Sequence, residues 1–418
     1  MNQILSGNSM ENGASNEALI GLPTLMTMAL SGVDLTPLGS RLMARAEIHP
    51  NDANTWMDIS TLLQLKGNHD IAMSMQAEAL KMQQLFQQPA ATSPCKIKLL
   101  AIMSPGDLMA NTPVQFLVEG TDIALDMLYV ARDMPLPATL PEHDLVFISV
   151  GESDENKALL MQLGQQFKHW PQPVLNTPEH IISVARDSAC ALLKSAPGVV
   201  MPATARIGRS ILEQIGCNAL AITNIISDAT FPIIIRPVGS HAGRGLMKLD
   251  QPSAILDYLE SMPETEFYIS SFVDYQGSDG FYRKYRIVLI GGRPYVCHMA
   301  ISEHWMIHYL NAGMADSTEK RDEEARFMAD FDNTFAQHHA AAFKAINQRI
   351  GLDYLGIDCA ETIDGKLLIF EVDSNMIVHA MDPVDVYPYK QPQMRKVFAG
   401  FRDMLLNAMK RTTPPEPN

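Results

Sequence analysis

Two kinds of hydrophobic pattern divide the chain. Between residues 53 and 86, apolar positions recur at helical spacing and are interrupted at 66–68, which predicts two packed amphipathic helices. A helix is also predicted over 35–47, where it is ended by His49-Pro50. The N-terminal part of the chain is therefore expected to be helical.

The helix pair over 53–86 resembles one tetratricopeptide unit, with small Ala72 and Ala79 letting its helices approach closely. Such units stack in groups of three or more, and one unit is found here. Two interpretations stay open: a surface for a protein partner or for a second copy in a homodimer, and a helical cap on the next domain. Residues 1–18, rich in Asn, Ser and Gly, are expected to form a loose N-terminus.

After a linker-like segment at 87–95, short apolar runs of strand length alternate with helical segments. This alternation predicts a small parallel sheet with crossover helices. Gly106 and Asp107 follow the first run, at the strand end where open sheets bind ligands, but the turn is not G-x-G-x-x-G and predicts no dinucleotide site. The predicted strands are 96–103, 124–130 and 144–150, and helices are predicted within 111–120 and 155–167.

The composition is that of a folded protein without disulfides. Of the 418 residues, 47% are hydrophobic, which is enough for two or three domains with their own cores. The five cysteines are scattered without a C-x-x-C pair, so neither a zinc ribbon nor a disulfide framework is expected. No stretch approaches the roughly 18 apolar residues of a membrane span, and a net charge of −15 opposes nucleic-acid binding. We expect a cytoplasmic protein that binds neither membranes nor nucleic acid.

The segment 231–249, FPIIIRPVGSHAGRGLMKL, is the first candidate for chemistry. An apolar run reaches Arg236, and three glycines then precede a second short apolar run. This is not a P-loop, because it lacks the G-K-[ST] ending and leads into a strand. Such a unit can fold as a flap whose backbone N–H groups approach phosphate oxygens. Taken alone, however, it fits a surface hairpin better.

A second candidate is the segment 354–375, which predicts two strands joined by a turn at Asp364-Gly365. Glu371 and Asp373 are two residues apart and would face the same side, and the hairpin can bring Asp358 opposite them. Three carboxylates on an otherwise apolar surface would repel one another unless a cation held them. Oxygen ligands of this kind suit Mg²⁺ that bridges nucleotide phosphates.

In their order these segments resemble the ATP-grasp ligases, of RimK-like or glutathione-synthetase type. The resemblance covers about residues 96–400 and rests on PIIIRP, the glycine flap, the hinge strand EFYISSFV, the arginine strand YRKYRIVLIGG, and a G-x-D plus E-x-[ND] hairpin. It implies an α/β chain, with an α+β ATP-grasp fold and a parallel-sheet pre-ATP-grasp domain behind an N-terminal all-α module. The expected division is 1–18 loose N-terminus, 19–95 helical module and linker, 96–175 pre-ATP-grasp domain, 176–410 ATP-grasp domain and 411–418 loose C-terminus.

The resemblance also implies nucleotide-binding residues. Arg236 would hold the α- and β-phosphates where the family more often has lysine, and Arg186 would make a second phosphate contact. Asp274 would replace the glutamate that usually binds the ribose. Flap residues over the phosphates would be Gly239, Ser240, His241, Gly243 and Gly245, and the backbone of Tyr268, Ile269, Ser270 and Phe272 would bind adenine. The Mg²⁺ ligands would be Asp358, Glu371 and Asp373.

Catalytic and substrate residues are expected on the flap, on the arginine strand and just after it. Arg286 is the candidate for contact with the γ-phosphate or an acyl phosphate, and Arg283, three residues earlier, would face the opposite side. His304 and His308 have the spacing of a helical zinc pair, but no third ligand is evident; a role in substrate binding or proton transfer and a role in packing and loop anchoring both stay open. Catalytic candidates are Arg244, Arg286 and His304; substrate candidates are Arg283, His298, Trp305, His308, Asn311 and Asn375.

The reaction that the resemblance implies joins a carboxylate to an amine. ATP would phosphorylate the carboxylate, and the amine of a small molecule or peptide would then attack the acyl phosphate and release phosphate. Mg²⁺ and arginines would offset the charge, while the flap excludes water. Two other classes stay open: an ATP-grasp kinase that phosphorylates a hydroxyl, and a non-catalytic protein that binds partners through its helical module.

Overall fold

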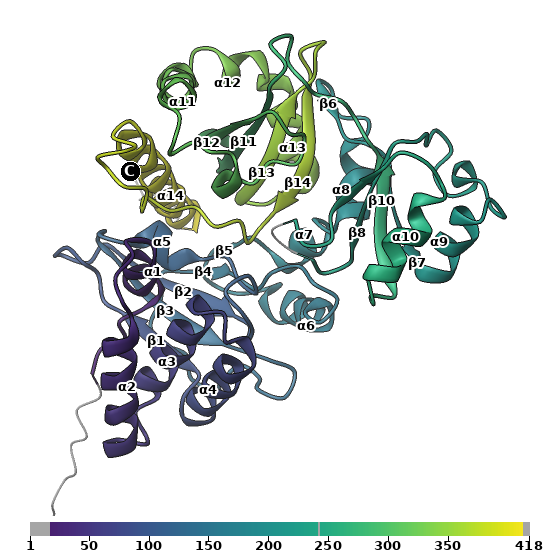
Figure 1. Cartoon of the computed structure of the whole chain (residues 1–418). Helices are drawn as coiled ribbons and strands as arrows, with labels where there is room; N and C mark the ends of the chain where they lie inside the picture. The colour runs from purple at the N-terminus through teal and green to yellow at the C-terminus, as the bar shows by residue number, and fades with distance from the viewer. Residues whose placement is uncertain (1–16, 241–242, 413–418) are drawn as a thin grey trace, which may run out of the picture.

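The computed structural model describes residues 17–240 and 243–412. Within this part of the chain, four helices precede three β-sheets, as Figure 1 shows from purple to yellow. None of the described helices is long and apolar enough to cross a membrane. The predicted flap residue His241 and most of the two expected loose termini lie outside the described residues. The last helix runs to Thr412, past the predicted start of the C-terminal tail.

Three of the four N-terminal helices form where the hydrophobic pattern predicted them, with a break at 66–68 between the third and the fourth. The first helix was not predicted, and residues 85–86, expected at the end of a helix, lie in a strand. The four helices are α1 (Leu22–Leu30), α2 (Thr36–Ile48), α3 (Ala53–Leu65) and α4 (His69–Met82). Ala72 and Ala79 of α4 are fully buried, which allows the close approach of α3 and α4. Met57 and Leu80 pack into the core of the first sheet. The helices therefore cover this sheet, as the cap interpretation requires.

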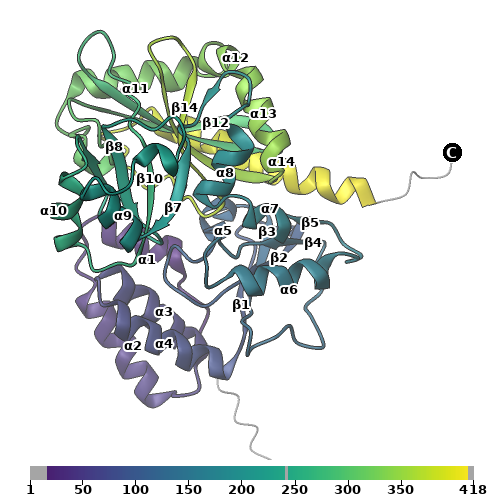
Figure 2. The same cartoon turned by 90° about the vertical axis from the view of Figure 1, so that its right-hand side faces the viewer.

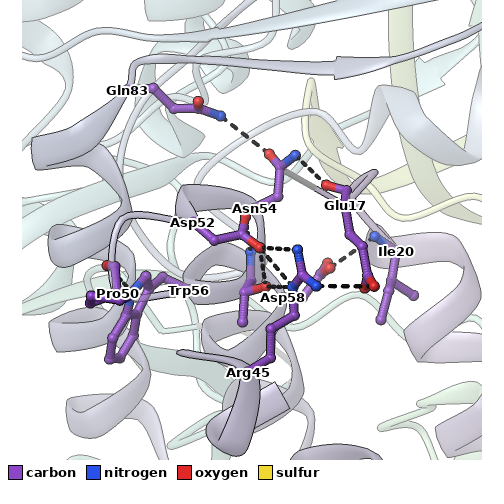
Figure 3. A network of polar contacts seen from close by, with 10 residues as sticks. Glu17, Ile20, Arg45, Pro50, Asp52, Asn54, Trp56, Asp58 and Gln83 are labelled. Atoms are coloured by element: carbon purple, nitrogen blue, oxygen red, sulfur yellow. Dashed lines mark hydrogen bonds and ion pairs between the residues drawn. The ribbon is translucent and has the colours of Figure 1, made fainter. Parts of the chain in front are cut away.

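A polar network joins the start of the described chain to these helices (Figure 3). Arg45 of α2 lies 2.7 Å from the Asp52 carboxylate, which caps α3, and 3.0 Å from that of Glu17. The carboxylate of Asp58 accepts hydrogen bonds from the backbone N–H groups of Ile20 and Gly21. Residues before α1 are thereby held against α3.

The first sheet has the strand order β1-β3-β2-β4-β5. Its strands are β1 (Leu85–Gln88), β2 (Ile97–Met103), β3 (Ile123–Tyr129), β4 (Leu145–Ile148) and β5 (Val174–Leu175), with helices α5 (Val114–Val118) and α6 (Lys157–Phe167) in its connections. All neighbours are parallel except β1, which runs antiparallel along β3. The parallel sheet is as predicted. However, β1 precedes the domain boundary expected at residue 95.

The second sheet is small, antiparallel and projects to one side of the molecule (Figure 1). Its order is β7-β10-β8-β9. It comprises β7 (Thr204–Gly208), β8 (Ile233–Pro237), β9 (Met247–Leu249) and β10 (Glu266–Ser271), with α9 (Arg209–Gly216), the 3₁₀ turn η1 (Ile222–Asn224) and α10 (Ala254–Ser261). Side chains from both α-helices and from the sheet share one apolar core. The glycine loop lies between β8 and β9, as predicted.

The third sheet has the order β12-β11-β13-β14-β6, and all its pairs are antiparallel except β14 with β6. It comprises β6 (Val199–Val200), β11 (Tyr282–Ile290), β12 (Arg293–Ser302), β13 (Tyr354–Glu361) and β14 (Leu367–Asp373). Beside it lie α7 (Pro178–Ile182), α8 (Arg186–Leu193), the 3₁₀ turn η2 (Tyr309–Asn311), α11 (Thr318–Asp330), α12 (Phe335–His338) and α13 (Ala340–Ile350). The carboxylate hairpin is β13–β14.

The C-terminal helix α14 (Lys390–Thr412) packs between the third and first sheets (Figure 2). Its Phe401 meets Phe147 of β4 and Tyr354 of β13 edge-on, at ring-centroid distances of 5.7 and 5.9 Å. One apolar core thus joins the first sheet to the sheet that carries the carboxylates. The predicted α/β class with an N-terminal helical module is confirmed.

Candidate active site

A cavity of about 510 Å³ lies between the second and third sheets. Its walls come from β8 and β10 on one side and from β11, β13 and β14 on the other. The start of α8 and the loop after β12 complete the walls. The predicted residues that line this cavity are Arg186, Arg236, Gly243, Tyr268, Ser270, Phe272, Arg286, Trp305, His308, Asn311, Asp358, Glu371 and Asp373.

Two arginines from different elements reach the cavity near each other. Strand alternation in β8 places Ile233 and Ile235 in the core and Arg236 on the opposite face. Arg186 begins α8, and its Nη2 lies 2.6 Å from Glu371 Oε1. Burial, and then the charge of Arg186, lower the pKa of Arg236 to about 10. An anion placed beside both guanidiniums would relieve their repulsion.

The three predicted carboxylates meet on adjacent strands. Asp358 of β13 pairs in register with Glu371 of β14. On β14, Val372 is buried in the core, whereas Glu371 and Asp373 face the cavity, as expected of residues two apart. The structure therefore brings all three carboxylates into one cavity with Arg186.

Asp358 is neutralised by two cations from β11. Arg286 holds it in a bidentate pair, with Nε–Oδ1 at 2.9 Å and Nη2–Oδ2 at 3.0 Å, and Lys284 Nζ lies 2.6 Å from Oδ2. Burial opposes ionisation of Asp358, but the charges of Arg286 and Lys284 outweigh it and hold its pKa well below its usual range. Lys284 was missed by the sequence reasoning. Its spacing of two from Arg286 on a strand was the signal that both share one face.

Glu371 and Asp373 differ in their electrostatic surroundings. Burial opposes ionisation of Glu371, but the charges of Arg186 and Arg236 lower its pKa. Burial, and then the charge of Glu371, raise the pKa of Asp373 to about 6. Asp373 thus lacks a cation partner comparable to those of the other two carboxylates. A divalent cation beside it would favour its ionised form.

The glycine loop between β8 and β9 is anchored at both ends. Arg236 donates to Ser240, from Nε to Oγ at 3.2 Å and from Nη2 to the carbonyl oxygen. The Tyr258 hydroxyl of α10 donates to the carbonyl oxygen of Gly245 at 2.8 Å. Gly243 has a φ of +75° and lines the cavity. Ser240 is buried beneath the loop, where it positions Arg236 instead of lining the cavity.

Two predicted loop residues, Arg244 and Gly239, lie away from the cavity lining. Arg244, a predicted catalytic residue, has a 70% exposed side chain that lies 3.6 Å from Glu264. Gly239 has a φ of +70° and open space where a Cβ would be. The structure thus brings Gly243 to the cavity and directs Arg244 elsewhere.

The backbone expected to bind adenine is largely committed to the second sheet. Residues 268–270 lie between β7 and β8 and pair with both. The side chain of Ile269 is buried in the sheet core, and Phe272 N–H donates to the carbonyl oxygen of Pro232 at 3.0 Å. Backbone groups that could bind an adenine base are therefore expected at the end of this segment.

At the end of the hinge segment, Ser271 and Val273 also line the cavity. Asp274, the predicted ribose ligand, is not part of this lining, and its Oδ1 accepts a hydrogen bond from Gln276 N–H at 3.1 Å. The hydroxyl-bearing residues of the hinge that do line it are Tyr268, Ser270 and Ser271.

The segment after β12 is a loop with one 3₁₀ turn, so His304 and His308 do not share a helical face. His304 is exposed and lies outside the lining, whereas His308 lines the cavity. Burial, and then the charges of Lys284 and Arg286, lower the pKa of His308. His308 is therefore neutral at neutral pH and able to accept a proton.

Trp305 and Asn311 also line the cavity. The ring of Trp305 meets that of Phe272 at 5.7 Å in an edge-on contact. Asn311 Oδ1 accepts a hydrogen bond from His308 N–H at 2.9 Å and so orders the loop.

Arg283 and His298, both predicted as substrate residues, lie outside the lining. Arg283 pairs with Asp279 at 2.6 Å and with Glu323 at 2.5 Å, on the face opposite to Arg286, as the spacing predicted. His298 packs against the ring of Tyr309 at 4.5 Å.

Asn375, which also lies outside the lining, joins the carboxylate strand to the first sheet. Its Nδ2 donates to the carbonyl oxygen of Met109 at 2.9 Å, and its N–H donates to Asp373 Oδ1 at 2.8 Å. Gly151, just beyond β4, touches it so closely that an ideal Cβ there would lie 1.5 Å from Asn375 Nδ2. Met109 itself lines the cavity.

A small antiparallel sheet with a glycine loop faces a larger antiparallel sheet with carboxylates, and a parallel sheet precedes both. This is the order of elements that the sequence resemblance implied. The chain has an ATP-grasp fold. No protein-family model and no curated protein matches the sequence.

Among solved structures, this chain is similar to VanG D-Ala:D-Ser ligase from Enterococcus faecalis, with 15% identity and a TM-score of 0.45 over 75% of this chain and 99% of that one. It is also similar to D-alanine–D-alanine ligase from Bacillus anthracis complexed with ATP, with 11% identity and a TM-score of 0.44 over 76% and 98%. A RimK-domain ATP-grasp protein from Sphaerobacter thermophilus has 15% identity and a TM-score of 0.41 over 74% and 99%. At such values the likeness carries no conclusion about chemistry.

Proposed function

We propose that the chain is an ATP- and Mg²⁺-dependent carboxylate–amine ligase of RimK-like type, which forms an amide or peptide bond and releases ADP and phosphate. The observation that carries this proposal is the convergence of Arg186 and Arg236 with Asp358, Glu371 and Asp373 in one cavity. Arginines bind phosphates and carboxylates bind divalent cations. A nucleotide polyphosphate with Mg²⁺ satisfies both sets at once.

The residues fit such a ligand electrostatically. Arg236 has a pKa lowered by burial and by Arg186, so a polyanion would stabilise its charged form. Asp373 has a pKa raised by burial and by Glu371, so a divalent cation would stabilise its ionised form. Bound Mg²⁺ would supply charge neutralisation at the phosphoryl oxygens.

Each wall of the cavity would then contact a different part of the bound nucleotide and substrate. Arg236 and Arg186 would bind phosphate oxygens from the two sheets, and Gly243 would bring the loop backbone over them. The hinge segment 271–273 would face the base and ribose. Glu371 and Asp373 would hold the cation, while Arg286 and its partner Asp358 would lie where the carboxylate is phosphorylated.

The loop after β12 would complete the second half-reaction. Lys284 and Arg286 provide positive charge for an acyl phosphate. His308, whose pKa is lowered by burial and then by these same charges, would accept the proton that the attacking amine loses. Trp305 would help to exclude water, which would otherwise hydrolyse the mixed anhydride. His308 thus takes the role that the sequence reasoning gave to His304.

The experiment is an ADP-release assay with purified protein, Mg-ATP and a panel of acids and amines. ADP release that requires both an acid and an amine, with an amide product by mass spectrometry, supports the ligase. A phosphorylated product formed without amine supports a kinase instead. Absence of nucleotide binding would reject both and leave a partner-binding role for the helical module, for which a homodimer or protein partner stays a prediction.

Glu371→Gln tests the assignment of Glu371 as a Mg²⁺ ligand. It keeps the size of the side chain but removes the charge that pairs with Arg186 and would hold Mg²⁺. We expect turnover to fall by at least about 10³-fold, as for loss of a group on which phosphoryl transfer depends, with an unchanged circular dichroism spectrum. Near-normal turnover would remove Glu371 from the metal site.

A further inference from the structure

Three potential metal ligands meet at the end of the third sheet remote from the hinge. His338 ends α12, His339 follows it, and Glu361 ends β13. Their ligand atoms lie within 4.8 Å of one another. Successive residues of a helix are rotated by about 100°, yet both rings reach the same carboxylate. From this geometry we propose a binding site for a transition-metal ion, Zn²⁺ being the probe of choice.

The distances between the ligand atoms suit a tetrahedral ion. His339 Nε2 lies 3.1 Å and His338 Nε2 lies 3.7 Å from Glu361 Oε1. Zinc bonds of about 2.0–2.1 Å in tetrahedral geometry separate the ligand atoms by about 3.3–3.4 Å. The two histidine–carboxylate distances thus lie on either side of this value, and the exposed His338 ring is free to adjust.

Packing holds the most buried ligand in place. The side chain of His339 is 2% exposed, and its ring lies 4.4 Å from Phe335 and 6.3 Å from Phe343, measured between centroids. On metal binding, only His338 and Glu361 would then have to be oriented. His338 is 58% exposed, which leaves the site open to ions and to a water as fourth ligand.

The ligand chemistry distinguishes this site from the proposed Mg²⁺ site. Two imidazoles and one carboxylate favour Zn²⁺ over Mg²⁺, which prefers oxygen ligands. The ring nitrogens must bind the metal without their protons, so binding releases protons and weakens in acid. In the structure His339 Nε2 is within hydrogen-bonding distance of Glu361 Oε1, and His338 Nε2 is within hydrogen-bonding distance of the Gly365 carbonyl oxygen, at 3.0 Å.

A bound ion would join α12 to the β13–β14 hairpin. Glu361 ends β13, and Gly365 lies in the hairpin turn. On the same two strands, Asp358 lies three residues before Glu361 and pairs with Glu371. The site would therefore stabilise the hairpin that presents the cavity carboxylates, without lying among them.

The test is calorimetric titration of Zn²⁺ into full-length protein that has been dialysed against a chelator and returned to buffer with millimolar Mg²⁺. We expect one Zn²⁺ equivalent that Mg²⁺ does not displace, and a rise in melting temperature. In His338→Ala and in Glu361→Gln this equivalent should be lost or bound at least about tenfold more weakly. His338 is exposed, so its variant should fold.

The matched control is His69→Ala, which removes another exposed histidine, from α4. It should bind Zn²⁺ as the unaltered chain does. Zinc bound at the cavity carboxylates would persist in His338→Ala, so only the equivalent that disappears there belongs to the proposed site. The proposal is overturned if the unaltered chain binds no Zn²⁺, or if His338→Ala leaves the stoichiometry and affinity unchanged.

Discussion

Arg236 illustrates how a single residue gains its chemistry from its surroundings. Its position on β8 is set by strand alternation, but its lowered pKa arises from burial and from Arg186, which begins a separate helix. Asp358 is the opposite case, because Arg286 and Lys284 keep it ionised. The cavity therefore contains charged side chains whose charge is stabilised by an opposite charge, such as Asp358, and others whose charge is not, such as Arg236. The second kind is expected to respond to a bound ligand.

Replacement of Arg236 by alanine tests the phosphate contact. Loss of a charge-assisted hydrogen bond costs about 1.5–3 kcal/mol, which corresponds to roughly 10- to 150-fold weaker ATP binding. Arg236→Lys should retain much of the affinity, because lysine is a common phosphate ligand. Binding of a fluorescent ATP analogue would measure both. Unchanged ATP affinity in Arg236→Ala would show that the loop is an ordinary surface hairpin.

The raised pKa of Asp373 predicts that Mg²⁺ binding weakens at acidic pH, which gives the binding profile an acid limb. This pKa of about 6 means that the carboxyl holds a proton below that pH, and Mg²⁺ must displace it. Apparent Mg²⁺ affinity should therefore be constant above about pH 7 and fall by up to about tenfold per pH unit below about pH 6. The dependence of ADP release on Mg²⁺ at a series of pH values would measure this limb.

Asp373→Asn is the control, because asparagine offers an oxygen ligand that does not titrate. Its Mg²⁺ affinity should be weaker at neutral pH, and the acid limb assigned to Asp373 should disappear. An identical limb in both proteins would assign the titration to another group.

At the scale of elements, the unit β8–loop–β9 depends on its glycines to different degrees. Gly245 has a φ of +68°, and an ideal Cβ there would lie 2.7 Å from Pro237 Cδ. Gly239 has a similar φ of +70° but nothing within 4 Å of its Cβ position. The two glycines thus separate the effect of backbone conformation from that of close packing.

Gly245→Ala should therefore be more harmful than Gly239→Ala. Both substitutions place alanine at positive φ, at a cost of about 1–2 kcal/mol, and Gly245→Ala adds a clash that must shift the loop. We expect a lower melting temperature and a higher KM for ATP in Gly245→Ala than in Gly239→Ala. Equal behaviour of the two variants in both measurements would contradict the anchored loop.

At the scale of the molecule, the cavity depends on contact between the first sheet and the carboxylate strand. Asn375 reaches from the end of β14 to the Met109 carbonyl oxygen, and Thr112 Oγ1 donates to the carbonyl oxygen of Ser374 at 2.8 Å. The α14 helix packs against both sheets. Gly151 makes this contact possible, because it leaves room for the Asn375 amide.

Gly151→Ala should loosen that contact. The added Cβ would force the buried Asn375 amide away from Met109, at a cost of about 1–3 kcal/mol for the lost hydrogen bond and overpacking. The melting temperature and the Mg²⁺-dependent turnover should both fall. Gly164→Ala is the control, since its Cβ would meet Pro178 at an ordinary 3.8 Å within α6. Equal melting temperatures and turnover in both variants would show that the contact tolerates the change.

The amino-acid sequence by itself determined part of the elements and the faces of their side chains. Periods of 3.6 and 2 identified α2, α3, α4, the central strands of the first sheet and the face shared by Glu371 and Asp373, because such spacing reflects local backbone geometry. Elements such as α1, β1, α11 and α13 were not predicted. Lys284 was within reach of the same reasoning. Residues whose place depends on an irregular loop, such as Arg244 and His304, were not, because no repeating geometry fixes their direction.

Only the tertiary structure decided which charges meet and how deeply they are buried. The pairs of Lys284 with Asp358 and of Arg186 with Glu371, and the tie of Asn375 to Met109, join residues far apart in the chain. Their strength and the resulting pKa values depend on distance and desolvation, which exist only after the sheets have packed together.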